Sequence, residues 1–185
     1  MGVNRKLVVL DRDGVINVDS DAYIKSPDEW VAIPGSLEAI ARLNQAGYRV
    51  AIASNQSGIG RGLFDMAALN AMHQKMNRAA ASVGGRIDAV FFCPHTAEDQ
   101  CDCRKPKPGM LQQIIDRFEI DADDTPLVGD SLRDLQAGET LGFRLHLVLT
   151  GKGEKTLKEG NLPEGTVVHK DLRAFALDLI AKHQD

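Results

Sequence analysis

Short apolar runs alternate with longer amphipathic stretches along the whole chain. Continuous apolar runs of four to six residues are typical of strands that are covered on both faces of a sheet. The stretches between them repeat apolar residues at helical spacing, as Met110, Ile114 and Phe118 do. The pattern predicts strands at Leu7–Leu10, Arg49–Ser54, Ala89–Phe92, Pro126–Val128 and Leu145–Leu149, and helices at Ser36–Gln45, Asp65–Ser82, Pro108–Phe118, Leu132–Leu141 and Leu172–Lys182.

The alternation of strands and helices predicts an α/β fold, with a doubly wound, mainly parallel sheet and helices on both of its faces. The 185 residues fit one domain, 1–185, which can bury roughly 70% of its unfolded surface. No internal repeat or low-complexity linker divides the chain, and the glycines between 151 and 153 indicate a surface loop.

Charge and hydropathy narrow the possible partners. The net charge of −4 gives the chain no general attraction to nucleic acid or to anionic lipid. No apolar run approaches the ~20 residues of a membrane-spanning helix, and the apolar run at the start is too short for a signal peptide. We therefore expect a cytoplasmic protein, monomeric, with no nucleic-acid or membrane partner.

Polar residues gather where three of the predicted strands end. Asp11 and Asp13 follow the first strand, residues 54–56 (Ser-Asn-Gln) end the second, and Asp130 follows the fourth apolar run. In a doubly wound parallel sheet, ligands bind at the carboxyl ends of the strands. The sequence therefore predicts one site built from these three strand ends.

The acidic residues in this set favour a metal site. Asp11 and Asp13, followed by glycine, could simply form a turn, and this alternative has about equal weight for a lone pair. A second pair, Asp130 and Asp134, is spaced to lie on one side of a helix. Several carboxylates at one rim repel one another unless a cation neutralises them, and oxygen ligands of this kind suit Mg²⁺.

A basic segment, "RKPKPGM", precedes the third predicted helix. Arg104, Lys105 and Lys107 could form a solvated basic loop. However, arginine offers a planar fork to phosphate oxygens and lysine offers a point charge. A site that combines such cations with Mg²⁺-binding carboxylates is suited to a phosphate group, whereas Lys107 is expected to be solvated.

The three cysteines lie within eleven residues, and an odd number so closely spaced does not form a disulfide framework. Cys93, His95, Cys101 and Cys103 match a closed, structural Cys₃His zinc site, with three unrelated thiols as the alternative. The predicted zinc loop, residues 93–103, directly precedes Arg104. Bound Zn²⁺ would fix the position of the cations that follow.

Four segments, "LDRDG", "SNQSG", "RKPKPGM" and "GDSLRD", occur in this order. Together they resemble the four motifs of the haloacid dehalogenase (HAD) superfamily, and most closely its histidinol-phosphate phosphatase-like branch. The resemblance implies a Mg²⁺-dependent phosphatase acting on a small phosphorylated sugar. The intervals between motifs hold only loops and single helices, so a large cap domain is not expected and the site should be open.

The resemblance also implies roles for individual residues. Asp11 would be the nucleophile that forms an aspartyl-phosphate, and Asp13 the general acid and base. Ser54 and Lys105 would stabilise the phosphoryl group. The expected Mg²⁺ ligands are Asp11, the backbone carbonyl of Asp13, and Asp130, with Asp134 supporting them from behind.

Substrate contacts are expected from the loop over residues 17–27 and from the motifs, although a solvated turn is an equal alternative for this loop. Many relatives carry lysine at the position of Ser131, and serine cannot supply that charge. The sequence therefore departs from the family at a contact to the second phosphate. The residues expected to bind substrate are Asp19, Ser20, Asp21, Tyr23, Asn55, Gln56, Arg104, Lys105 and Ser131.

Three other functions compete with a sugar bisphosphate phosphatase. A histidinol-phosphate phosphatase would share the motifs and the zinc loop. A polynucleotide 3′-phosphatase is disfavoured by the negative charge of the chain. A zinc-stabilised phosphosugar-binding protein would have no need of the acid–base carboxylate Asp13.

Overall fold

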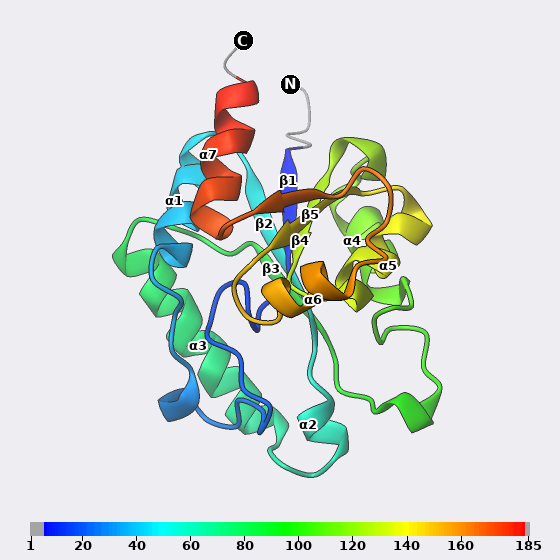
Figure 1. The fold of residues 1–185 in the computed structure, drawn as a ribbon. Helices are drawn as coiled ribbons and strands as arrows, with labels where there is room; N and C mark the ends of the chain where they lie inside the picture. Colours follow the sequence, from blue (N-terminus) through cyan, green and yellow to red (C-terminus); the bar gives the residue numbers. More distant parts are fainter. Residues whose placement is uncertain (1–5, 184–185) are drawn as a thin grey trace.

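A six-stranded, fully parallel sheet forms the centre of the computed structural model, which describes residues 6–183 (Figure 1). The strand order is β3-β2-β1-β4-β5-β6. This order is that of a doubly wound fold: strands are added on one side from β1 to β3 and on the other side from β4 to β6, so the strand order switches between β1 and β4. The strands are β1 Leu7–Leu10, β2 Arg49–Asn55, β3 Ala89–Cys93, β4 Pro126–Gly129, β5 Arg144–Val148 and β6 Val167–His169.

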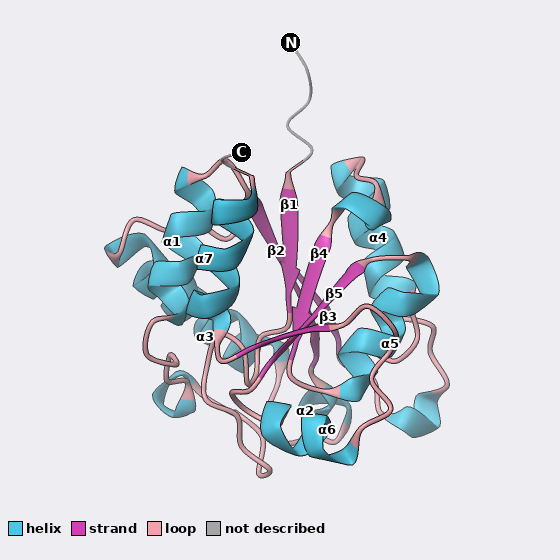
Figure 2. Cartoon of the chain, turned by 45° about the horizontal axis from the view of Figure 1, so that its top comes forward, coloured by secondary structure: helices cyan, strands magenta, loops and turns pink. Residues whose placement is uncertain are grey.

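Helices cover both faces of the sheet (Figure 2). Successive side chains of β1 point to opposite faces, so Val8 and Leu10 pack in one core and Leu7 and Val9 in the other. This double burial explains the continuous apolar run. The first core is covered by α1 (Ser36–Gln45), α3 (Met66–Ser82) and α7 (Leu172–Lys182), and the second by α4 (Gly109–Phe118) and α5 (Leu132–Leu141).

The expected fold class is confirmed, and the structure contains every predicted strand and helix with ends shifted by one residue at most. The sequence pattern missed β6, whose three residues are too few to show a period. It also missed two short helices, α2 (Ser57–Gly60) and α6 (Gly153–Glu159), which lie beside the carboxyl ends of the strands (Figure 2). The remaining elements are the 3₁₀ turns Pro27–Glu29, Ala97–Asp99 and Ala122–Asp124.

Strand register places the functional segments together. Leu10 pairs with Ile52 of β2 and with Val128 of β4, so Asp11 emerges level with the ends of both neighbours. The backbone N–H of Asp11 donates to the carbonyl of Val128 at 3.0 Å. The expected cluster of polar residues therefore lies at the topological switch point between β1 and β4.

Nothing in the described part of the chain forms a separate domain over this edge. The β1–β2 connection adds a loop, a 3₁₀ turn and α1, and the β2–β3 connection adds α2 and α3. The expected absence of a large cap therefore agrees with the topology of residues 6–183. Within that range, no helix has the length and apolar character needed to cross a membrane.

Candidate active site

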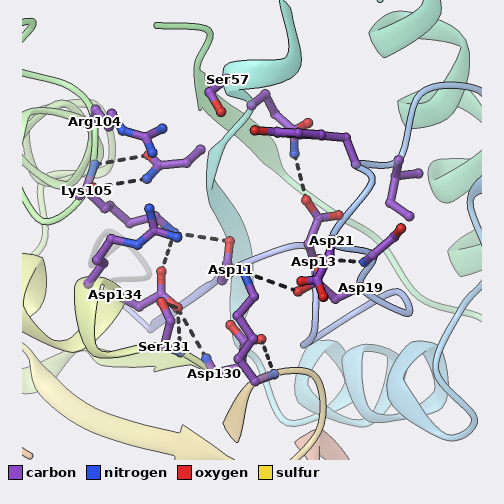
Figure 3. A pocket seen from close by; sticks show the side chains of 17 residues that line it. Asp11, Asp13, Asp19, Asp21, Ser57, Arg104, Lys105, Asp130, Ser131 and Asp134 are labelled. Carbon is purple, nitrogen blue, oxygen red and sulfur yellow. Dashed lines mark hydrogen bonds and ion pairs between the residues drawn. The ribbon is translucent and has the colours of Figure 1, made fainter. Parts of the chain in front are cut away.

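A cavity opens at the carboxyl ends of β1, β2 and β4, with Asp11 at its centre (Figure 3). Lys105, Asp134 and Arg104 lie on one side of Asp11, and Asp13, Asp19 and Asp21 lie on the other. The lining residues are Asp11, Asp13, Asp19, Ser20, Asp21, Tyr23, Ile24, Asn55, Gln56, Ser57, Arg104, Lys105, Asp130, Ser131, Arg133, Asp134 and Lys152.

The carboxylate of Asp11 has one oxygen engaged and one available. Oδ1 accepts hydrogen bonds from the backbone N–H of Arg12 at 2.9 Å and from Lys105 Nζ at 3.1 Å. None of the residues in the described chain donates to Oδ2. A carboxylate held in this way can present Oδ2 to a reacting group in the cavity.

Asp13 is held from behind by a buried arginine. Its Oδ1 accepts from Arg12 Nε at 3.0 Å, from Arg12 Nη2 at 2.8 Å and from Asn17 Nδ2 at 2.9 Å. The third nitrogen of the Arg12 guanidinium lies 3.2 Å from His73 Nε2, on α3. Asp13 Oδ2 has a single donor, Gln56 Nε2 at 3.1 Å. This oxygen therefore has the free capacity needed to carry a proton.

Lys105 is a buried cation with all three of its N–H donors used. Nζ contacts Ala53 O at 2.8 Å, Asp11 Oδ1 at 3.1 Å and Asp134 Oδ1 at 2.6 Å. Burial acts to lower the pKa of Lys105, but the charges of Asp11 and Asp134 outweigh it and raise the pKa above its usual value. The Asn55 amide fixes this loop, because it bonds both the N–H and the carbonyl of Lys105.

Asp134 lies in the first turn of α5 and supports the carboxylates of the site. Its Oδ2 accepts from the backbone N–H groups of Asp130 and Ser131 and from the Ser131 hydroxyl, at 3.0–3.2 Å. Burial alone would raise the pKa of Asp134, but Lys105 and Ser131 hold it below its usual range. With both oxygens engaged by protein donors, Asp134 fits the supporting role expected from the sequence.

Asp130 is enclosed by backbone. Its Oδ2 accepts from the N–H of Lys152 at 2.9 Å. A Cβ atom at Gly14 would lie 2.0 Å from this oxygen, and one at Gly151 would lie 2.3 Å from it. The surface loop expected at residues 151–153 is a turn whose first two residues are exposed, but the segment does more than connect elements: Gly151 borders the site, and Gly153 is buried at the start of α6.

The acidic groups leave an excess of negative charge that a cation would offset. Oxygen atoms of Asp11, Asp130 and Asp134 lie within 4.8 Å of one another. Burial, then repulsion from Asp134, raises the pKa of Asp11 to about 7, although Lys105 opposes the shift. Burial, then repulsion from Asp11, raises the pKa of Asp130 to about 9. Hard oxygen donors with this unrelieved repulsion fit Mg²⁺.

The predicted zinc ligands also lie together. Cys93 Sγ is 3.6 Å from Cys101 Sγ and 2.9 Å from Cys103 Sγ, and His95 Nδ1 is 3.3 Å from Cys103 Sγ. All four ligand atoms fall within 4.8 Å of one another. A tetrahedral site with Zn–S bonds of about 2.3 Å has sulfur–sulfur edges of about 3.8 Å, so the cluster has the composition and size for zinc.

The zinc loop is connected directly to the active site. The backbone N–H of Arg104 donates to Cys101 and, despite burial, helps to lower the pKa of that thiol to about 6. Lys107 Nζ donates to the carbonyl of Cys101 at 2.8 Å. Residues 101–107 therefore form one hydrogen-bonded unit that carries Lys105 into the cavity.

Comparison with known proteins agrees with this geometry. A family model described as HAD-hydrolase-like matches residues 102–175. A Bordetella bronchiseptica protein is 59% identical over 175 residues, covering 95% of this chain and 98% of its own, and a Pseudomonas aeruginosa protein is 52% identical over 178 residues, covering 96% and 99%. Both are named D-glycero-beta-D-manno-heptose-1,7-bisphosphate 7-phosphatase. The chain belongs to this family of HAD phosphatases.

Solved structures of the family match the phosphatase over nearly its whole length. The B. bronchiseptica D,D-heptose 1,7-bisphosphate phosphatase, crystallised with magnesium and phosphate, superposes with a TM-score of 0.95, covering 96% of this chain and 99% of that one. The Burkholderia thailandensis enzyme is 70% identical, with a TM-score of 0.78 and coverage of 95% and 99%.

Of the catalytic, substrate-binding and magnesium residues predicted for the phosphatase, only Ser54 does not line the cavity. Ser54 is buried, and its Oγ accepts from Gln56 Nε2 at 2.8 Å. Sequence reasoning missed Ile24, Ser57, Arg133 and Lys152. Two of them were visible in principle, because Ser57 lies within "SNQSG" and Arg133 within "GDSLRD".

Proposed function

We propose that the protein removes the 7-phosphate from D-glycero-β-D-manno-heptose 1,7-bisphosphate, in the synthesis of nucleotide-activated heptose. The names of the relatives support this substrate, including the β anomer. The observation that carries the proposal is the convergence of Asp11, Asp130 and Lys105 around one cavity, from three separate segments.

The arrangement supports transfer of the phosphoryl group to Asp11. Asp11 Oδ2 attacks phosphorus, the bond from phosphorus to the sugar oxygen breaks, and Asp13 Oδ2 gives its proton to that oxygen. Asp13 then takes a proton from the water that attacks the aspartyl-phosphate, which releases inorganic phosphate, restores the Asp11 carboxylate and returns Asp13 to its protonated form.

Mg²⁺ would be held by Asp11, Asp130 and the backbone carbonyl of Asp13, as the resemblance to the family implies. When bound, it would neutralise charge on the phosphoryl oxygens and favour the ionised form of Asp11. Lys105 supplies a fixed positive charge beside the nucleophile. We retain Ser54 and the backbone of Asn55 as proposed donors to the phosphoryl group. The proposed contacts to the rest of the substrate are Asp19, Ser20, Asp21, Tyr23, Gln56, Arg104 and Ser131.

We also propose that Cys93, His95, Cys101 and Cys103 hold a structural Zn²⁺. A closed set of four protein ligands leaves no position for substrate, so this ion would act on the fold rather than on the reaction. The single domain, a cytoplasmic location and a monomeric state remain our proposals. Size-exclusion chromatography with light scattering would test the last.

Phosphate release tests the substrate. We expect the protein with Mg²⁺ to prefer the β anomer of heptose 1,7-bisphosphate over the α anomer, histidinol phosphate, fructose 1,6-bisphosphate and a 3′-phosphorylated oligonucleotide. A higher kcat/KM for histidinol phosphate would contradict the substrate and leave the chemistry standing. Absence of turnover on every phosphate ester would favour the phosphosugar-binding alternative.

The acid–base role has its own test. Asp13→Asn should lower kcat by about 10²- to 10⁴-fold, because the amide cannot exchange the proton that the leaving oxygen needs. Mg²⁺ affinity and the unfolding midpoint should change little. Asp116→Asn, an exposed substitution on α4, serves as the control. Retention of more than a tenth of the wild-type kcat in Asp13→Asn would contradict this role.

A further inference from the structure

Arg133 is a cation whose position is not explained by the stability of the fold. It is the second residue of α5, which begins at Leu132 after the capping residue Ser131. The helix dipole disfavours positive charge in the first turn. Arg133 is exposed, and none of the described residues forms a hydrogen bond or ion pair with its side chain.

Arg133 lies where two cavities meet. It lines the active-site cavity, and it also lines a second cavity of about 270 Å³ beside the zinc loop. Arg104 and Lys105 are shared by both cavities, and Lys107 lines the second. The space beyond the nucleophile on this side is therefore bordered by cations.

The guanidinium groups at this junction are available for a ligand. Lys105 has no donor left, as described above. The hydrogen bond of Arg104 Nη1 to His95 O is long, at 3.5 Å. The acidic side chains of Asp19 and Asp21 lie across the cavity from Arg104 (Figure 3). A second anionic group on the substrate is therefore attracted toward Arg104 and Arg133 and away from the loop over residues 17–27.

Ser131 cannot supply this charge. Its hydroxyl donates to Asp134 Oδ2 at 3.0 Å and so is part of the cap of α5. Arg133, two residues further along the chain, places a long cationic side chain at the same rim of the active-site cavity.

We propose that Arg133, together with Arg104, binds the second phosphoryl group of the substrate, and that Arg133 supplies at this rim the positive charge that Ser131 cannot. This inference rests on the proposed function, because it requires a bisphosphate. Two guanidinium forks can hold a phosphate through paired N–H···O bonds, which a single ammonium group cannot do.

The test compares two substrates that differ only in the second phosphate: heptose 1,7-bisphosphate and heptose 7-phosphate. The ratio of their kcat/KM values should fall roughly tenfold or more in Arg133→Ala, the loss expected when a hydrogen bond to a charged group is removed. Arg133→Lys should restore part of the ratio, and Arg133→Glu should lower it further. The salt dependence of KM for the bisphosphate should weaken in Arg133→Ala.

Arg173 gives a matched control, because it is the second residue of α7 and is exposed, yet it does not line either cavity. Arg173→Ala removes the same charge from the same helical position and should leave the ratio unchanged. In a double-mutant cycle, Arg104→Ala and Arg133→Ala should be non-additive, since both contact one group.

Two results would overturn the inference while the proposed function stands. One is an unchanged ratio in Arg133→Ala; the other is an equal loss on both substrates, which would indicate a general effect on the site. A wild-type protein that hydrolyses neither heptose phosphate would contradict the proposed function. It would also contradict the role assigned to Arg133, which depends on that function.

Discussion

Single residues at this site are positioned by partners far away in the sequence. Asp11, Asp13 and Asp130 could be predicted because each follows a strand in a recognisable motif. The burial of Arg12 could not, because an arginine between two aspartates is ordinarily solvated. Arg12 is fully buried. The partner of its Nη1 atom is His73, which lies 61 residues further along the chain. Only the folded chain brings α3 behind the first strand.

Gly14 is the residue whose replacement should damage the metal site most selectively. Its φ of +82° and the 2.0 Å that would separate its Cβ from Asp130 Oδ2 both exclude a side chain. Gly14→Ala should lower the free energy of unfolding by about 1–3 kcal/mol through backbone strain. It should also weaken Mg²⁺ binding about 10- to 100-fold, because Asp130 must move. Calorimetric titration with Mg²⁺ measures the second effect.

Gly142→Ala is the control that separates the effect of backbone strain from the effect of displacing Asp130. Gly142 has a φ of +83°, but no atom within 4 Å would meet its Cβ. It should lose similar stability while keeping wild-type Mg²⁺ affinity. Equal Mg²⁺ affinities for the two variants would show that Gly14 does not shape the site.

Among the secondary-structure elements that the sequence pattern missed, α6 is the one that holds a site residue in place. α6 supplies Thr156, whose hydroxyl donates to the carbonyl of Asp130 at 2.8 Å, and Lys152 caps it. A seven-residue helix with two buried residues shows little amphipathic period, so its pattern is too weak to predict. Long helices such as α4, with apolar residues over three turns, were predictable because packing against the sheet dictates their sequence.

Residues 93–103 act as one element, and the zinc proposed for them can be tested separately from magnesium. We expect about one equivalent of zinc per chain by elemental analysis. A zinc-selective chelator, with Mg²⁺ kept in excess, should lower kcat/KM, because the segment that carries Arg104 and Lys105 loses its fixed geometry. Cys101→Ser should reproduce the loss, and added Zn²⁺ should restore the chelated wild type.

Ser82→Ala on the exposed end of α3 is the control for handling and purity. Fewer than half an equivalent of zinc after purification in zinc-replete medium would contradict the four-ligand site. Full activity after complete removal of zinc would leave the cluster without a positioning role.

At the scale of the whole molecule, strand order turns scattered motifs into a site. Alternating patterns predicted a parallel sheet, and the carboxyl-end rule predicted where ligands bind. The pairing of β1 with both β2 and β4 is a long-range property that no local pattern contains. The histidines illustrate the same limit: His146 on β5 and His169 on β6 have nitrogen atoms 2.9 Å apart, although 23 residues separate them.

These two histidines should make stability depend on pH. Burial, then the neighbouring His169 and Lys182, lowers the pKa of His146 to about 4, with Asp178 opposing; burial also lowers the pKa of His169. The unfolded chain, in which a histidine pKa is about 6.5, therefore binds more protons than the folded chain between pH 6.5 and 4. Stability is complete above pH 6.5 and falls as the pH drops toward 4.

Urea unfolding at pH 7.5 and at pH 5.5 measures how the free energy of unfolding depends on pH. His146 alone should contribute a loss of about 1.4 kcal/mol between these values, so the total loss should be smaller by about this amount in His146→Gln. Saturating Mg²⁺ is needed, because the raised pKa values of Asp11 and Asp130 would otherwise stabilise the folded state as the pH falls. His183→Gln, at the exposed end of α7, should keep the wild-type slope. A pH dependence of stability in His146→Gln as steep as that of the wild type would mean that the loss of stability in acid does not arise from His146.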